Sequence, residues 1–207
     1  WESSGVTEYL EDKKRQLLDS IRLEQQRIRK IEIAMRDFKE STIETHYNVT
    51  IKSVPGCKIL SLRKTVADYY CEGRLWEQLY AFVREEQIKL SPGTNNLAIY
   101  HNGGTTEDGV DIEVGVMVER EGADKGGFCY RETEAVEDMA CIMVYGPYEN
   151  IGLSYHAFAC WMEEHSQYEI AGPSRQICHI GSWDESDSQK FLTEVQTPVR
   201  RILTLTP

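Results

Sequence analysis

Two glutamates occupy matching positions in two similar stretches of the chain. Glu113 lies within residues 112–119 and Glu194 within residues 193–200, and aromatic residues are frequent around both stretches. A carboxylate among aromatic rings suits a lipophilic cation, because each ring face contributes about 0.5 to 2 kcal/mol of cation–π attraction. We therefore predict a ligand-binding site, and for reasons given below we expect no catalytic residue, metal or cofactor in it.

The candidate ligand-binding residues are the two glutamates, one glutamine and eight aromatic residues. They are Tyr69, Trp76, Tyr100, Glu113, Tyr145, Tyr148, Tyr155, Trp161, Gln176, Trp183 and Glu194. Trp76 and Tyr155 have core spacing on predicted helices, so packing is the alternative interpretation of both. A solvated strand edge is the alternative for the two glutamates. Trp161 falls off the main apolar stripe of its helix, and Trp183 lies in the polar stretch 181–185, so packing explains these large indoles less easily.

These residues belong to a unit that occurs twice, at about residues 57–119 and 138–200. The two glutamates are 81 positions apart, as are Ile99 and Ile180, whereas the offset is 79 further upstream. An offset that changes only in a loop is typical of a duplicated supersecondary unit. We expect one pseudo-symmetric domain with a seam between its halves.

The pattern within each copy predicts a strand, a helix and two further strands. In the first copy these are residues 58–63, 75–83, 96–101 and 111–119, and in the second 139–145, 151–162, 175–180 and 190–200. The order predicts an α+β domain, a tandem βαββ unit whose mixed or antiparallel sheet of about eight strands carries two helices on one face. Because Glu113 and Glu194 alternate away from the valines, we expect both on the opposite face, in a groove along the seam.

Heptad spacing before the repeat predicts a coiled-coil helix over about residues 6–40. Its seam residues are Leu10, Leu17, Ile21, Ile28, Ile31, Met35 and Phe38. At 1.5 Å per residue the seam from Leu10 to Phe38 is roughly 43 Å long, more than a compact domain of this size needs. We expect it to hold a homodimer; the alternative is a single amphipathic helix packed on its own domain. The predicted domains are residues 1–45 and 46–207.

Composition narrows the class of protein. The net charge of −11, from 34 acidic and 23 basic residues, does not attract phosphate backbones, so we expect no nucleic-acid binding by this chain itself. No apolar run approaches the about 18 residues that span a membrane. The six cysteines lack CxxC spacing, which favours reduced thiols in a cytoplasmic protein over disulfides or zinc. The start at Trp1 without Met leads us to expect a fragment of a longer protein.

Four short motifs follow the long helix in a fixed order. They are Asp111-Ile112-Glu113-Val114, Gly146-Pro147-Tyr148-Glu149, Ala171-Gly172-Pro173-Ser174-Arg175 and Glu194-Val195-Gln196-Thr197-Pro198-Val199. This arrangement resembles the carboxy-terminal part of a MerR-family transcription regulator, whose effector domain is similar to the GyrI-like (gyrase-inhibitor-like) small-molecule-binding fold. The resemblance implies a small-molecule ligand, an antiparallel homodimer helix, and DNA binding only through an amino-terminal winged helix-turn-helix that is absent from these residues.

The family resemblance also implies where an enzyme would carry its catalytic pair. Some relatives hydrolyse electrophilic small molecules with a Glu-x-Tyr pair in the strand after the second Gly-Pro turn. Here that strand has Gln176 and Cys178 at the two positions, and a glutamine cannot act as a general base. Cys178 and His179 are strand neighbours, so their side chains point to opposite faces. We therefore predict a non-enzymatic sensor of a lipophilic, multidrug-type ligand, with a cation as one candidate. A GyrI-like hydrolase and a gyrase-inhibitor-like protein-binding module are the alternatives.

Overall fold

The chain forms two compact units, residues 1–45 and 46–207. The computed structural model describes residues 10–18, 21, 25, 28, 47–91, 96–101 and 109–202. In the first unit residues 10–18 are helical. Its apolar side chains are 52–59% exposed at Leu10, Leu17, Leu18, Ile21 and Ile28. The other predicted seam residues, Ile31, Met35 and Phe38, lie outside the described residues, so dimerisation stays a prediction.

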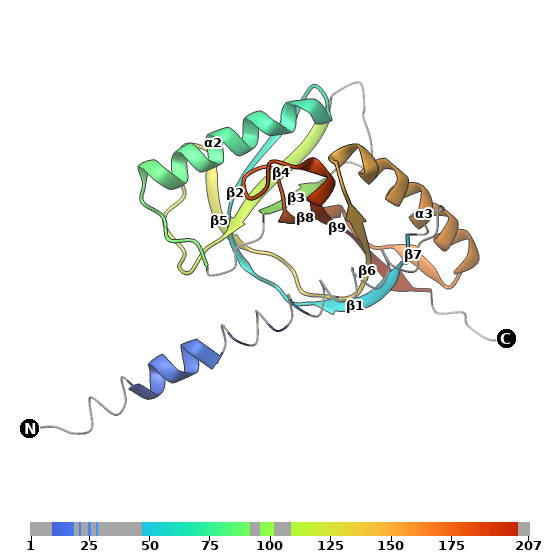
Figure 1. Cartoon of the computed structure of the whole chain (residues 1–207), viewed down its shortest axis with the longest axis horizontal. Coiled ribbons are helices and arrows are strands. Elements are labelled where there is room, and N and C mark those ends of the chain that lie inside the picture. The colour runs from blue at the N-terminus through green and yellow to red at the C-terminus, as the bar shows by residue number, and fades with distance from the viewer. Residues whose placement is uncertain are drawn as a thin grey trace, which may run out of the picture. The chain divides into compact units, whose positions relative to one another are not determined.

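One antiparallel sheet dominates the described part of the second unit (Figure 1). Its order is β1 (Thr50–Val54), β6 (Val136–Tyr145), β9 (Leu192–Arg201), β8 (Ser174–Ile180), β3 (Asn96–Tyr100), β4 (Val110–Met117), β2 (Lys58–Val66) and β5 (Phe128–Glu132), and β7 (Tyr168–Ile170) pairs with β9. The strand order is equivalent when it is counted from either edge of the sheet. From one edge it is β1, β6, β9 and β8, and from the other it is β5, β2, β4 and β3. The β8–β3 ladder is therefore a central seam, and duplication of one unit stays our interpretation.

Helix α2 (Glu72–Glu85) covers the half of the sheet that contains β2, β3 and β4. Its buried Leu79 packs in one cluster with Leu62 of β2 and Val114 of β4. Burial of an apolar side chain of this size is worth about 1.5–3 kcal/mol, so the predicted apolar stripe fixes the helix on the sheet. The one-turn helix η1 (Tyr69–Cys71) precedes α2.

Helix α3 (Ile151–Glu164) covers the other half and follows a second one-turn helix, η2 (Tyr148–Asn150). Phe158 packs with Ile142 of β6 and Val195 of β9. The ladders from β4 through β3 and β8 to β9 keep the two packed surfaces on one side of the sheet. Both helices therefore lie on the same face, as Figure 1 shows.

Two connections cross each other on the face away from the helices (Figure 1). One joins β1 to β2 and the other joins β5 to β6. Where they meet, the amide of Thr133 donates a hydrogen bond to the carbonyl of Cys57 at 2.8 Å, and the amide of Cys57 donates to the Thr133 hydroxyl at 3.0 Å. A Cβ at Gly56 would lie 2.5 Å from the Thr133 carbonyl oxygen, so the close approach requires glycine. As a result β1 pairs with β6 and β5 with β2.

The six predicted strands and both predicted helices are present near their expected positions, but β1, β5 and β7 were not predicted. The strand pairing also corrects the alignment of the two copies in the sequence. Ile99 lies opposite Glu113, and Ile177 lies opposite Glu194. The position that matches Ile99 is therefore Ile177 and not Ile180, because the second connection between these strands is three residues longer.

Candidate functional site

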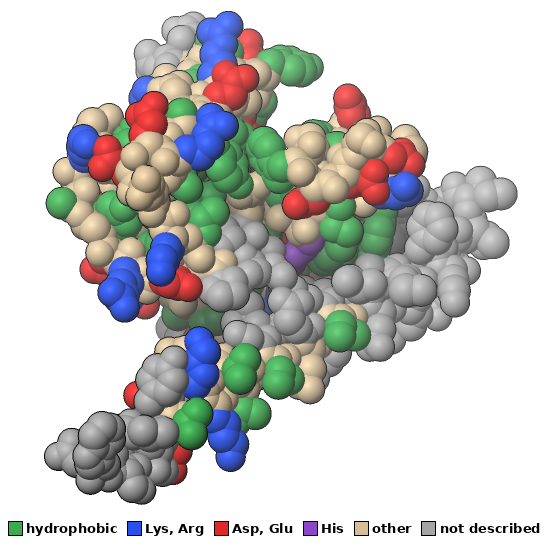
Figure 2. Space-filling model, turned by 60° about the vertical axis from the view of Figure 1, so that its left-hand side comes forward, with side chains coloured by type: hydrophobic (Ala, Val, Ile, Leu, Met, Phe, Trp, Pro, Cys, Tyr) green, Lys and Arg blue, Asp and Glu red, His purple; other side chains and the backbone are tan. Residues whose placement is uncertain are grey.

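A cluster of aromatic side chains lies on the helix face, over the central seam. We name it the aromatic site. It comprises Tyr69, Glu72, Trp76, Tyr80, Tyr100, Tyr148, Tyr155, Gln176, Cys178 and Trp183. The two seam strands supply members from the same side because alternate residues of a strand share a face. Figure 2 shows that the surface in view is hollowed, with hydrophobic side chains along the walls of the hollow.

The carboxylate of Glu72 is the polar centre of the part of the site that α2 supplies. Trp76 Nε1 donates a hydrogen bond to its Oε1 at 2.8 Å, and the Tyr100 hydroxyl donates to its Oε2 at 2.7 Å. No Lys, Arg or His in the described part of the chain forms an ion pair with Glu72. Burial, and then the Glu72 carboxylate, raise the pKa of Tyr100 well above its usual value, so this phenol remains a hydrogen-bond donor at neutral pH.

Tyr155 of α3 and Gln176 of β8 form the facing part of the site. The Gln176 amide donates to the Tyr155 hydroxyl at 3.3 Å. Burial raises the pKa of Tyr155, and this hydrogen bond opposes the shift only in part. Glu72 and Tyr69 also influence the Tyr155 phenol electrostatically, so groups from the two helices approach one another across the seam.

A thiol and a phenol extend the site along β8. The Tyr148 hydroxyl lies 3.8 Å from Cys178 Sγ. Burial and the nearby thiol raise the pKa of Tyr148 to about 12. Burial also raises the pKa of Cys178, although the contact with Tyr148 opposes the shift. Both groups are therefore protonated at neutral pH, and Cys178 is not an activated nucleophile.

The connection between β8 and β9 adds Trp183 to the site. Its ring centroid lies 5.8 Å from that of Trp76 and 5.5 Å from that of Tyr80, and half of the side chain stays exposed (50%). The connection approaches the sheet closely at Gly181, where a Cβ would lie 2.4 Å from Cys178 Sγ. A half-exposed ring beside two others offers a stacking surface to a flat ligand.

Seven of the eleven predicted ligand-binding residues belong to the aromatic site. They are Tyr69, Trp76, Tyr100, Tyr148, Tyr155, Gln176 and Trp183. The other four lie elsewhere. Trp161 of α3 is partly buried and packs against the core of that half, and it stacks on His165 with ring centroids 4.3 Å apart. Tyr145 follows Val144 on β6, so alternation directs it to the face away from the helices. The remaining two are the glutamates.

Glu113 faces away from the helices, as predicted, but it is only 3% exposed and is not among the rings. Arg131 of β5 donates to its two carboxylate oxygens at 2.7 Å each, and His101 Nε2 lies 2.8 Å from Oε2. Burial alone would raise the pKa of Glu113, but hydrogen bonds from Arg131, Ser61 and His101 lower it to about 2. The structure therefore separates this carboxylate from the aromatic residues with which the sequence analysis grouped it.

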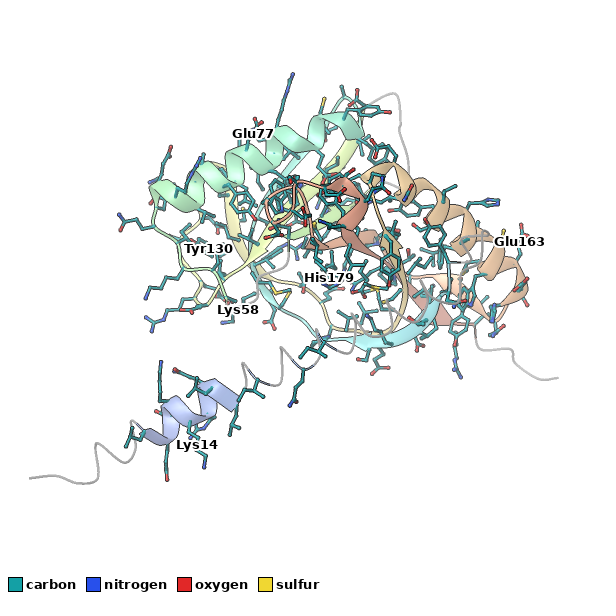
Figure 3. The ribbon with its side chains drawn as sticks, in the orientation of Figure 1. Lys14, Lys58, Glu77, Tyr130, Glu163 and His179 are labelled. Atoms are coloured by element: carbon teal, nitrogen blue, oxygen red, sulfur yellow. The ribbon has the colours of Figure 1, made fainter. Side chains whose placement is uncertain are left out.

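Glu194 has matching surroundings in the other half. It is fully buried (0% exposed) and pairs with Lys52 of β1; His179 Nε2 lies 2.8 Å from its Oε2, and the Gln196 amide donates to Oε1 at 3.0 Å. Burial alone would lower the pKa of Lys52, but Glu194 and Cys141 together outweigh burial and the pKa is raised. Figure 3 shows His179 in the middle of the domain. The contacts confirm that Cys178 and His179 face opposite sides of β8.

Sequence reasoning missed Glu72 and Tyr80, together with the partners of the two buried glutamates. These partners are Lys52, His101, Arg131 and His179. An acidic residue in the first turn of a helix is normally explained by the helix dipole. The usable signal was spacing, because Glu72 and Trp76 are four residues apart and so share a helix face.

Other kinds of site find little support in the described residues. They contain no group of three or more His, Cys, Asp or Glu that could hold a metal ion. The six cysteines are free. Among the helices of the described part, none combines the length and the apolar character required to cross a membrane.

Comparisons with known proteins identify the family and the fold. Residues 47–200 match the family model of the GyrI-like small molecule binding domain. No curated protein matches the chain in sequence. The fold is similar to that of EcmrR in an EcmrR–DNA complex, with a TM-score of 0.70 and 22% identity over 93% of this chain and 72% of that one. It is also similar to the EcmrR C-terminal domain (TM-score 0.65, 23% identity, 75% of this chain and 99% of that one). A third similar structure is SAV2435 bound to tetraphenylphosphonium (TM-score 0.53, 12% identity, 74% and 94%).

Proposed function

Because the chain belongs to the GyrI-like small molecule binding domain family, we propose that it senses a small molecule and that the aromatic site holds the ligand. We further propose that it is the effector part of a MerR-family transcription regulator in the cytoplasm. The similarity of its fold to EcmrR supports this, since that MerR-family protein forms a complex with DNA. In this proposal DNA is bound through a separate DNA-binding domain.

The ligand we propose is a lipophilic cation with aromatic rings. The observation that carries this is Glu72, a carboxylate held by two neutral donors among aromatic rings, without a cationic partner in the described part of the chain. A cation placed between the rings gains cation–π attraction and also compensates this charge. SAV2435, which has a similar fold, binds tetraphenylphosphonium, a cation of this kind.

A pair of matched titrations tests the proposal. Tetraphenylphosphonium and neutral triphenylphosphine oxide are added to the protein, and binding is followed through quenching of Trp76 and Trp183 fluorescence. A charge pair about 5 Å apart at an effective dielectric constant of about 20 is worth roughly 3 kcal/mol. Desolvation of the carboxylate offsets part of this. Glu72→Gln should therefore weaken binding of the cation by about 5- to 30-fold and leave the neutral compound nearly unchanged.

The control variant is Glu77→Gln, which removes a carboxylate from the outer side of the same helix (Figure 3). It should alter neither titration. If Glu72→Gln weakened both compounds equally, or neither, the carboxylate would not contribute to selectivity. If neither compound bound the wild-type protein, the aromatic site would not be a site for this class of ligand.

One contact favours a second candidate, a small-molecule hydrolase. The Glu72 carboxylate and the Tyr100 phenol lie side by side at 2.7 Å, and Glu–Tyr pairs carry hydrolysis in some relatives. The first proposal remains the better one because Tyr100 is only 7% exposed and its O–H is already donated to Glu72. Release of nitrophenol from an activated ester, abolished by Glu72→Gln and by Tyr100→Phe, would establish the hydrolase.

We also propose that the helix at residues 6–40 holds a homodimer. The apolar side chains of Leu10, Leu17, Ile21 and Ile28 are each more than half exposed in a single chain. Burial of such side chains against a second helix removes them from water, which is favourable by roughly 25 cal/mol for each Å². A dimeric arrangement would place two sensing domains on one regulator.

A further inference from the structure

Two sets of three side chains connect the seam with the edges of the sheet. We name the first the β1 set, which consists of His179, Glu194 and Lys52, and the second the β5 set, which consists of His101, Glu113 and Arg131. In each set a buried carboxylate contacts a histidine at the end of a seam strand. The same carboxylate accepts hydrogen bonds from a cation on an edge strand. The sets are named after the strand that supplies the cation.

Each set adjoins the aromatic site through one peptide bond. His179 follows Cys178, and His101 follows Tyr100. Successive side chains of a strand point to opposite faces, so each site residue and its neighbouring histidine lie back to back. A ligand that displaces the backbone at Cys178 or Tyr100 must also displace the histidine behind it.

The carboxylates cannot accommodate such a displacement at low cost. Glu194 is 0% exposed and Glu113 is 3% exposed, so water does not replace a hydrogen bond that is lost. When His179 moves, Glu194 must follow it or change its contact with Lys52. The displacement therefore reaches the edge strand.

The two sets differ in what their edge strands lead to. The β1 strand is the first of the domain, and the chain before Thr50 leads back to the helix at residues 10–18. Strand β5 instead connects two strands within the domain. Among the described strands β1 pairs with β6 alone, and its ladder is irregular between Lys52 and Val54. The ion pair of Lys52 with Glu194 connects β1 past β6 to β9, so it adds to the contacts that hold this strand.

We propose that the β1 set transmits occupancy of the aromatic site to β1 and thereby to the chain that precedes it. The β5 set has the same chemistry but ends inside the domain, so it stabilises the fold without passing a signal outward. This inference rests on the proposed function, because it requires a ligand in the aromatic site. It assigns to Lys52 a role in the response that is separate from ligand affinity.

Hydrogen exchange of residues 47–54, measured by mass spectrometry with and without tetraphenylphosphonium, tests the inference on the 207-residue chain. In the wild-type protein the compound should change the exchange rate of this segment by roughly threefold or more. Lys52→Met should abolish the change, while its affinity for the compound stays within about twofold of wild type. Arg131→Met is the matched control, since it removes the cation of the β5 set, and here the change should persist.

The outcomes separate this inference from the proposed function. If the compound binds but the exchange of residues 47–54 does not respond, or responds equally in Lys52→Met, the inference is overturned and the proposed function stands. Equal loss in Lys52→Met and Arg131→Met would show general destabilisation and would also overturn it. Absence of binding to the wild-type protein would overturn both. Should Lys52→Met not fold, Lys52→Gln retains a donor to Glu194 and is expected to reduce the response by at least about half.

Discussion

The surroundings of Glu113 predict how acid destabilises the domain. Its pKa is about 2 in the folded protein, against an ordinary value of 4.5. A group whose folded pKa is lowered contributes stability that is fully present above the unfolded pKa and is lost as the pH falls through the folded pKa. At about 1.4 kcal/mol for each pH unit, this carboxylate contributes about 3 kcal/mol at pH 7. The contribution should decline between about pH 4.5 and pH 2.

The variant Glu113→Gln isolates this contribution, since it removes the charge and nearly keeps the shape. Urea denaturation followed by tryptophan fluorescence should give a free energy of unfolding about 3 kcal/mol lower than wild type at pH 7, and only about 1.5 kcal/mol lower at pH 3. Glu77→Gln, on the exposed side of α2, is the control and should change it by less than about 0.5 kcal/mol at either pH. A deficit for Glu113→Gln that is the same at both pH values would refute the reasoning, because the ionised carboxylate would then not be its cause.

Three further predictions concern the site and the assembly. Gly181→Ala places a Cβ 2.4 Å from Cys178 Sγ, so thermal unfolding should show a loss of about 1–3 kcal/mol, and an unchanged melting temperature would contradict the packing. Gln176→Glu adds a charge to the aromatic site and should strengthen binding of a cationic dye by about 5- to 30-fold without strengthening a neutral one; equal changes for both dyes would place residue 176 away from the ligand. Ile21→Glu combined with Ile28→Glu should convert a dimer into a monomer in light scattering, whereas a wild-type monomer at micromolar concentration would rule out the dimer helix.

Periodicity predicted the helices and strands in which one side is buried and the other is exposed or polar. The helical stripe that includes Leu79 and the alternation of Val114 with Glu113 each follow from contact with a core on one side only. The strand Thr50–Val54 has a mixed burial pattern and five residues, so no such signal marks it. Its partner, β6, is decided by the crossing of two connections, which is a tertiary contact that local pattern does not encode.

The sequence predicted which kinds of residue form the site, but it did not predict which acidic residue belongs to it. Alternation correctly directed Glu113 and Glu194 away from the helices, yet it could not reveal that cations from the two unpredicted edge strands already pair with them. The rings were predicted because few residue types offer such surfaces. Glu72 was not, since its role depends on Tyr100, a partner 28 positions away on a seam strand.

Because β1 pairs with β6 and β5 pairs with β2, the order of translation affects when each half of the domain can form. Thr50 pairs with Cys141, 91 positions later, so β1 emerges from the ribosome long before β6, its partner among the described strands, exists. Until then its hydrogen-bonding groups are open to other chains, which is the condition under which unpaired strands aggregate. The half that contains β2, β3, β4 and β5 spans residues 58–132, so all of its strands are available before β6 is translated, whereas the other half joins β1 to strands that end at residue 201. The half that contains β1 can therefore close only late, after β8 and β9 have been translated.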